Sequence, residues 1–142
     1  MPDFRFFYPI EVRYGDLDPQ GHVNNACYLT YMEQARIAYI QTLGLWPGGT
    51  FLDIGIILAE AQVAFNSPIL YGQKLRVGVR VSRLGNKSLT MDYLLEDAEN
   101  GKRLASGSSV LVTYDYRDAR SLPIPEDWRK AIESFEAFSN DS

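Results

Sequence analysis

The sequence predicts an α+β fold in which a five-stranded antiparallel sheet wraps around one long central helix, followed by a short C-terminal helix. Three observations predict it: helical spacing of apolar residues over 25–43, a period of two over the later segments, and turn dipeptides between those segments. At about 1.5 Å per residue the helix is roughly 27 Å long, which matches strands of about eight to ten residues at about 3.3 Å each. The sheet can therefore curl around it.

The first strand and the helix come from the N-terminal third. Residues 4–14 are rich in Phe, Tyr, Ile and Val and predict a strand that ends at Gly15. The helix is expected to be largely buried, to end at Gly44, and to be followed by a loop over 46–49. Its apolar spacing is carried by Tyr28, Met32, Ala35, Tyr39 and Leu43, and its narrow polar side by Thr30, Gln34 and Gln41.

Four strands follow, because apolar and polar residues alternate beyond residue 53. The dipeptides Gly85-Asn86 and Asn100-Gly101 accept the backbone angles of tight turns, so the last three strands should form a meander. A short helix is expected after Pro125, with Trp128 on its apolar face. The expected strands cover residues 55–65, 74–82, 88–96 and 103–116.

Composition limits the function. The 142 residues fit one domain, and no apolar run approaches the roughly 18 residues of a membrane span. A single cysteine and a start that does not resemble a leader favour the cytoplasm. One histidine and one cysteine give no metal-ligand cluster, so we expect no metal. A net charge of -4 argues against a duplex nucleic-acid binder.

The candidate site lies where an acidic loop, RYGDLDPQGHVNN, meets the start of the long helix. A helix start offers unpaired N–H groups and the positive end of the helix dipole, which stabilise an oxygen that gains negative charge. The carboxylate of Asp18 could face the same point as nucleophile or general base. The Asp18 carboxylate and the N–H groups of the helix start would then lie on either side of one substrate carbonyl.

The pattern D-x-D-x-x-G-H-x-N-N-x-x-Y at positions 16–28 resembles the acyl-CoA thioesterases of the 4-hydroxybenzoyl-CoA thioesterase type, including their long-chain acyl-CoA relatives. The resemblance covers nearly the whole chain and implies one hotdog-fold thioesterase-like domain over residues 1–142. It implies that Asp18 is catalytic, that the backbone N–H of Asn25 is the oxyanion donor, and that Lys87 contacts the CoA phosphates. The family hydrolyses acyl-CoA to free acid and CoA with no further cofactor, as homodimers or homotetramers whose active sites lie between protomers. The expected substrate-binding residues are Gly21, His22, Asn24, Tyr28, Lys87 and Ser88.

Several residues also have a structural interpretation. Asp18 could make an Asx-type turn, and Asp16 is expected to hold the loop together through backbone N–H groups. Asn24 and Asn25 are both candidate helix caps, and Gly21 is expected to serve the backbone. Four further residues have mainly structural interpretations. Cys27 is expected to pack in the interior, Glu33 to form an ion pair with Arg36, Glu60 to face outward, and Tyr28 to belong to the core or to a wall of the pocket.

Two other functions remain open from the sequence. A domain that binds an acyl thioester without hydrolysing it would keep the pocket without needing an ionised Asp18. A hotdog hydratase or dehydratase would need a histidine for proton transfer, and His22 is the candidate, although it more simply fixes the loop or lines the pocket.

Overall fold

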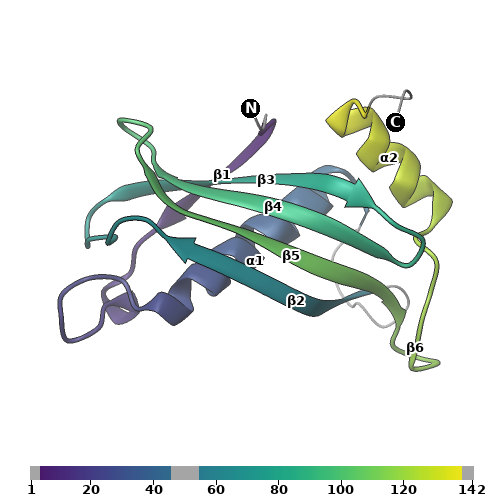
Figure 1. The fold of residues 1–142 in the computed structure, drawn as a ribbon, viewed down its shortest axis with the longest axis horizontal. Helices are drawn as coiled ribbons and strands as arrows, with labels where there is room; N and C mark the ends of the chain where they lie inside the picture. Colours follow the sequence, from purple (N-terminus) through teal and green to yellow (C-terminus); the bar gives the residue numbers. More distant parts are fainter. Residues whose placement is uncertain (1–3, 46–54, 139–142) are drawn as a thin grey trace.

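The computed structural model describes residues 4–45 and 55–138 and confirms the hotdog arrangement, with one sheet curled around a long helix. Figure 1 shows α1 (Asn25–Thr42) crossing one face of the sheet. The loop expected over 46–49 lies outside the described residues. In the part of the chain that is described, no helix is long and apolar enough to cross a membrane.

The sheet has the order β1-β3-β4-β5-β2, all antiparallel, so the predicted meander of β3, β4 and β5 is confirmed. A two-residue strand, β6 (Arg120–Ser121), also pairs with β5 and was not predicted, since two residues carry no periodic pattern. The other strands are β1 (Phe6–Glu11), β2 (Gly55–Phe65), β3 (Lys74–Leu84), β4 (Ser88–Asp97) and β5 (Arg103–Asp115).

The first strand is shorter than the predicted 4–14. Its pairing with β3 ends where Glu11 meets Lys74, and the chain then makes a 3-10 turn over Tyr14–Asp16. The turn begins the acidic loop, so the residues predicted to close the strand instead lead into the candidate site.

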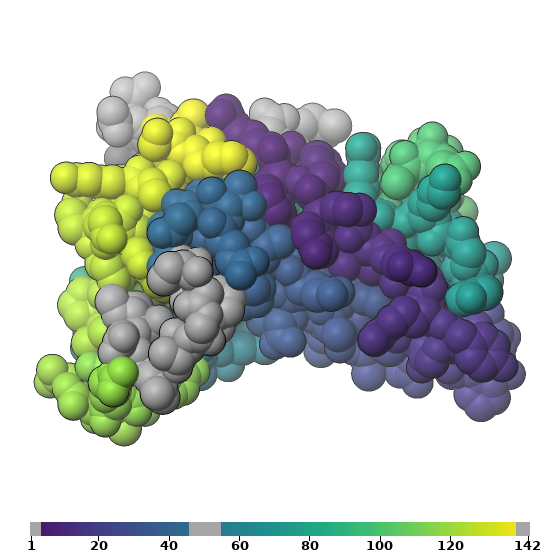
Figure 2. Space-filling view, turned by 180° about the vertical axis from the view of Figure 1, so that it is seen from behind, coloured from purple at the N-terminus to yellow at the C-terminus, as the bar shows by residue number. Residues whose placement is uncertain are grey.

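The helix matches its predicted bounds, and Gly44 follows it with a φ of +76°, a conformation that glycine adopts without strain. The prediction that α1 is largely buried is wrong for one of its sides, where Leu29 and Glu33 are exposed in the single chain. Figure 2, from behind, shows α1 in blue at the surface. Its buried residues are Tyr28, Tyr31, Met32, Ala35, Arg36, Tyr39 and Ile40.

The helix packs tightly against the sheet at Gly107 of β5. A Cβ added there would lie 2.8 Å from Met32 Cε and 2.7 Å from the backbone oxygen of Gln62. Glycine is therefore required by space, since its φ is not in the left-handed region. This contact sets how closely the sheet wraps around α1.

The short helix α2 (Glu126–Glu136) covers the end of the core at the C-terminus of α1. Glu136 accepts hydrogen bonds from Tyr39 Oη (2.6 Å) and from the backbone N–H of Val81 (3.0 Å). Because β1 pairs with β3 only up to Val79, the Val81 N–H lies on an edge that no strand of the described residues covers. The Glu136 carboxylate takes the place of a strand there.

We predict that Gly107→Ala lowers the free energy of unfolding by about 1–3 kcal/mol, since Met32 or the β2 backbone must move. Urea unfolding measures this. Gly15→Ala is the matched control, because nothing lies within 4 Å of its added Cβ and its φ is not positive. Equal stability of the two variants would contradict the close contact.

Candidate functional site

The acidic loop folds into a tight hairpin immediately before α1. Leu17 and Val23 form an antiparallel bridge, and the Asp18 N–H donates to His22 O at 2.9 Å. The Gly21 N–H returns to Asp18 O at 3.0 Å, and Gly21 has a φ of +88°. The prediction that Gly21 serves the backbone is confirmed, because few side chains tolerate that angle.

The hairpin is fixed to its surroundings by backbone bonds. The Val23 N–H donates to Ile69 O at 2.8 Å, and His22 bridges Leu70. The Asn24 N–H donates to Asp16 O at 2.9 Å. The hairpin therefore holds Asp18 opposite His22, and His22 lies three residues before Asn25, the first residue of α1.

Asp18 makes an Asx-type turn, as one interpretation of the sequence expected. Its Oδ1 accepts the Gln20 N–H at 2.9 Å. Its Oδ2 lies 3.8 Å from His22 Nδ1, which is too long for a hydrogen bond, and 19% of the side chain is exposed. One carboxylate oxygen is thus oriented by the backbone while the other is available to a ligand.

The two asparagines at the start of α1 have different roles. Asn24 is the N-cap, since its side chain accepts the Ala26 N–H at 2.9 Å and its carbonyl accepts the Cys27 N–H. Among the described residues, none accepts a hydrogen bond from the Asn25 N–H. A free donor at the positive end of an 18-residue helix can stabilise a developing oxyanion.

Asp16 has a different environment from Asp18. It is 4% exposed and accepts hydrogen bonds from the Arg13 N–H (3.0 Å), the Arg13 guanidinium (3.1 Å) and Tyr31 Oη (2.7 Å). Burial acts to raise the pKa of Asp16, but these bonds and the Arg13 charge outweigh it and hold the pKa below its ordinary value. The prediction that Asp16 holds the loop is confirmed, although side chains supply more of the donors than the backbone.

Cys27 is partly buried behind Asp16, and its Sγ lies 3.7 Å from Asp16 O. Burial, and then the charge of Asp16, raise the pKa of the Cys27 thiol. A thiol held in its protonated form is a poor nucleophile, so this position favours the packing role that the sequence predicted.

The remaining carboxylates also take structural positions. Glu33 pairs with Arg36 at 3.5 Å, as expected, with two thirds of its side chain exposed. Glu60 accepts a 3.4 Å hydrogen bond from Gln62, which lies on the face of the sheet away from α1, so its outward orientation is confirmed.

Tyr28 is buried one turn into α1. It contacts Phe65 edge to face, with the ring centroids 4.8 Å apart. This pair marks the end of β2 that lies beside the helix start.

Two predicted substrate-binding residues lie at the other end of the sheet. Ser88 begins β4 opposite Val112, whereas Leu95, seven residues later, pairs with Ala105 beside Phe65. Seven residues of strand span roughly 23 Å. Lys87 and Ser88 are therefore not brought together with Asp18 of the same chain.

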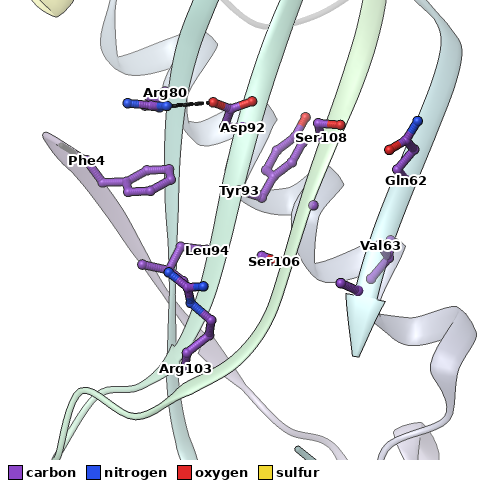
Figure 3. A pocket seen from close by; sticks show the side chains of 12 residues that line it. Phe4, Gln62, Val63, Arg80, Asp92, Tyr93, Leu94, Arg103, Ser106 and Ser108 are labelled. Atoms are coloured by element: carbon purple, nitrogen blue, oxygen red, sulfur yellow. Dashed lines mark hydrogen bonds and ion pairs between the residues drawn. The ribbon is translucent and has the colours of Figure 1, made fainter. Parts of the chain in front are cut away.

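A shallow hollow of about 420 Å³ opens on the face of the sheet away from α1 (Figure 3). Arg80 is paired there with Asp92 at 2.8 Å, and Phe4 lies beside the guanidinium. The hollow includes neither Asp18 nor the helix start. Across residues 4–45 and 55–138, no group of three or more His, Cys, Asp or Glu side chains is arranged to hold a metal ion.

The fold, one antiparallel sheet curled around a long helix, is the hotdog fold. The model of the Thioesterase-like superfamily matches residues 12–132. A solved thioesterase from Thermus thermophilus, complexed with coenzyme A and Zn, is 39% identical, with a TM-score of 0.83 over 98% of this chain and 100% of that one. The chain therefore belongs to the Thioesterase-like superfamily, and the predicted enzyme class, thioester hydrolase, is confirmed.

Two curated relatives match most of the chain. The 1,4-dihydroxy-2-naphthoyl-CoA hydrolase of Synechococcus elongatus is 27% identical over 134 residues, covering 90% of this chain and 96% of the relative. The long-chain acyl-CoA thioesterase FadM of Escherichia coli is 23% identical over 124 residues, covering 87% and 94%. The similarity thus extends over most of the chain rather than the loop motif alone.

We predict that Asp16→Asn destabilises the protein by about 1–3 kcal/mol at neutral pH, because three donors lose a charged acceptor. The pKa of Asp16 is lowered by folding, so its stabilisation is present above the ordinary aspartate pKa of about 3.9 and is lost as pH falls through the lower folded value. Urea unfolding at neutral and acid pH should therefore show the two proteins converging in acid.

Asp127→Asn is the control, since Asp127 is exposed in the first turn of α2 and should change stability by less than about 1 kcal/mol. A gap for Asp16→Asn that is no larger than for this control, or that stays constant with pH, would contradict the role of Asp16.

Proposed function

We propose that this enzyme hydrolyses acyl-CoA thioesters to a free acid and CoA at the start of α1. The observation that carries the proposal is the Asn25 N–H, from which no residue in the described part of the chain accepts a hydrogen bond, beside the hairpin that holds Asp18. CoA thioesters as the substrate class are supported by the names of the relatives, which include an aryl-CoA hydrolase and a long-chain acyl-CoA thioesterase.

In the proposed reaction the thioester carbonyl oxygen accepts the Asn25 N–H. Asp18 either removes a proton from a water that attacks the carbonyl carbon or attacks that carbon itself to give an anhydride that water then opens. In both routes the negative charge passes to the carbonyl oxygen, where the helix start stabilises it. Collapse of this oxyanion breaks the C–S bond, and CoA leaves as a thiolate that takes up a proton; in the second route this step forms the anhydride, and water opens it afterwards.

The neighbouring residues have supporting roles in this proposal. Gly21 and Asn24 shape the loop and cap the helix, while His22 and Tyr28 border the acyl group. A carboxylate, an amide and water suffice for the reaction, so we propose that no cofactor takes part beyond the CoA of the substrate.

We further propose that the active enzyme is a homodimer, or a pair of such dimers, joined through β2. This strand lies at the end of the sheet and pairs only with β5 within the described chain. Leu58 and Phe65 on it, and Leu29 on the adjacent side of α1, are each 44–48% exposed. An apolar edge strand of this kind favours pairing with another strand.

A two-fold dimer could also bring Lys87 and Ser88 of one chain close to the helix start of the other. A two-fold axis across β2 would turn the far end of the partner's sheet toward the helix start of the first chain. In this proposal the CoA phosphates contact Lys87 of the partner subunit. The expected role of Lys87 is then compatible with its roughly 23 Å separation from the helix start of its own chain.

We predict that Asp18→Asn lowers kcat for an acyl-CoA panel by about 10²–10⁴-fold, because the amide can neither attack nor accept a proton. Release of free thiol from short-chain, long-chain and aromatic acyl-CoAs measures it. Asp92→Asn, which changes the same chemical group on the outer face of the sheet, should retain turnover. Turnover that survives in Asp18→Asn but is lost in Glu33→Gln would assign the reaction to the helix carboxylate instead.

We predict that co-expressed Asp18→Asn and Lys87→Ala chains recover activity at low substrate concentration that neither variant has alone. If each site combines Asp18 of one chain with Lys87 of its partner, random pairing leaves about a quarter of the sites with both native residues. If both residues come from one chain, no site is intact. Lys102→Ala in place of Lys87→Ala is the control for removing a surface lysine, and light scattering reports whether the chains pair.

A further inference from the structure

One side of α1 connects the helix start to a buried arginine. Asn25, Leu29, Met32 and Arg36 are spaced by four, three and four residues, so they lie on one face of the helix. Arg36 is eleven residues from Asn25, or roughly 16 Å along the axis, and helical side chains tilt back toward the N-terminus. Its guanidinium therefore lies about two turns from the proposed oxyanion site.

A pocket of about 130 Å³ lies along this face, between α1 and the sheet. Its apolar walls include Leu29, Leu58 and Ala61, and it begins one turn beyond Asn25. An acyl group whose carbonyl lay at the Asn25 N–H would therefore run along α1 toward Arg36.

At the polar end of the pocket, the hydrogen-bonding capacity of Arg36 is only partly used. Arg36 is 6% exposed and donates from Nη1 to Tyr93 Oη at 3.2 Å, while Tyr93 Oη lies 2.6 Å from Ser109 Oγ. Among the described residues, none accepts a hydrogen bond from the buried Nε of Arg36. A buried polar atom without a partner is costly and rare in proteins, and it points to a ligand.

The charge of Arg36 is also poorly balanced. Its ionic partner is Glu33 at 3.5 Å, whose carboxylate is two thirds exposed and so screened by solvent. An oxygen acceptor that enters the pocket, above all an anionic one, would meet the guanidinium and the two hydroxyls in a low-dielectric site.

We propose that Arg36, with Tyr93 and Ser109, binds an oxygen acceptor at the far end of the acyl group. This rests on the proposed function and narrows it to acyl-CoAs whose acyl part carries a distal carboxylate or ring hydroxyl. Arg36 is then the residue that determines specificity, at a distance from the carbon that reacts.

The test compares kcat/KM within two matched substrate pairs: suberoyl-CoA against octanoyl-CoA, and 4-hydroxybenzoyl-CoA against benzoyl-CoA. The native enzyme should prefer the oxygen-bearing member of at least one pair, and the pair identifies whether the acceptor is a carboxylate or a hydroxyl. Arg36→Met keeps an unbranched side chain and should reduce that preference about tenfold or more, the usual effect of losing hydrogen bonds to a charged group. Arg80→Met removes an arginine from the other face of the sheet and should keep the native preference.

Three results would overturn the proposal. The first is the absence of any preference in the native enzyme while octanoyl-CoA or benzoyl-CoA is hydrolysed. The second is a fall in kcat/KM for both members of a pair by the same factor in Arg36→Met. The third is an Arg36→Met variant that keeps the native preference but no longer forms a dimer in light scattering. That result would mean that Arg36 pairs with a carboxylate of a second copy of the chain. Absence of hydrolysis of every substrate by the native enzyme would instead reject the proposed function.

Discussion

A single long helix has to cover the inner face of the whole sheet, and most of the structure depends on this constraint. The alternating strands turn residues such as Val79 and Tyr93 toward α1, and β5 carries Gly107 where Met32 of the helix packs against the sheet. The helix does not reach every part of the core, so α2 closes one end with Trp128 and Ile132. At the other end the helix begins, and the Asn25 N–H, which has no partner among the described residues, lies beside the acidic hairpin.

The hairpin shows how two aspartates in one short motif acquire different properties. Asp16 is surrounded by donors from Arg13 and Tyr31, which lower its pKa and occupy its oxygens. Asp18, two residues later, is oriented by one backbone N–H and keeps an oxygen free. The first carboxylate gives the loop its shape, and that shape presents the second one beside the helix start.

Features with local causes could be predicted from the sequence. The period of two located β2 over Gly55–Phe65, and helical spacing located α1. The contact of Glu136 with Val81, 55 residues apart, carries no local signal. The exposed side of α1 was missed because an exposed apolar residue such as Leu29 looks the same in a sequence as a core residue. The loop part of the site was predictable for a similar reason, since hairpin and cap are local, whereas the distance of Lys87 from Asp18 depends on strand register.

The bond between Glu136 and the Val81 N–H has a consequence for assembly. A sheet with two open edges can add neighbours on both sides and grow into a fibre, whereas a sheet with one open edge stops growing after a single pairing. Among the described strands, β1 is short and carries Pro9, which has no N–H to donate, and the Val81 N–H on the exposed stretch of β3 beyond it is bonded to the α2 carboxylate. That leaves β2 as the open edge among the described strands. If chains pair through β2 as proposed, the C-terminal helix, far from the proposed site, helps to limit that pairing to two chains.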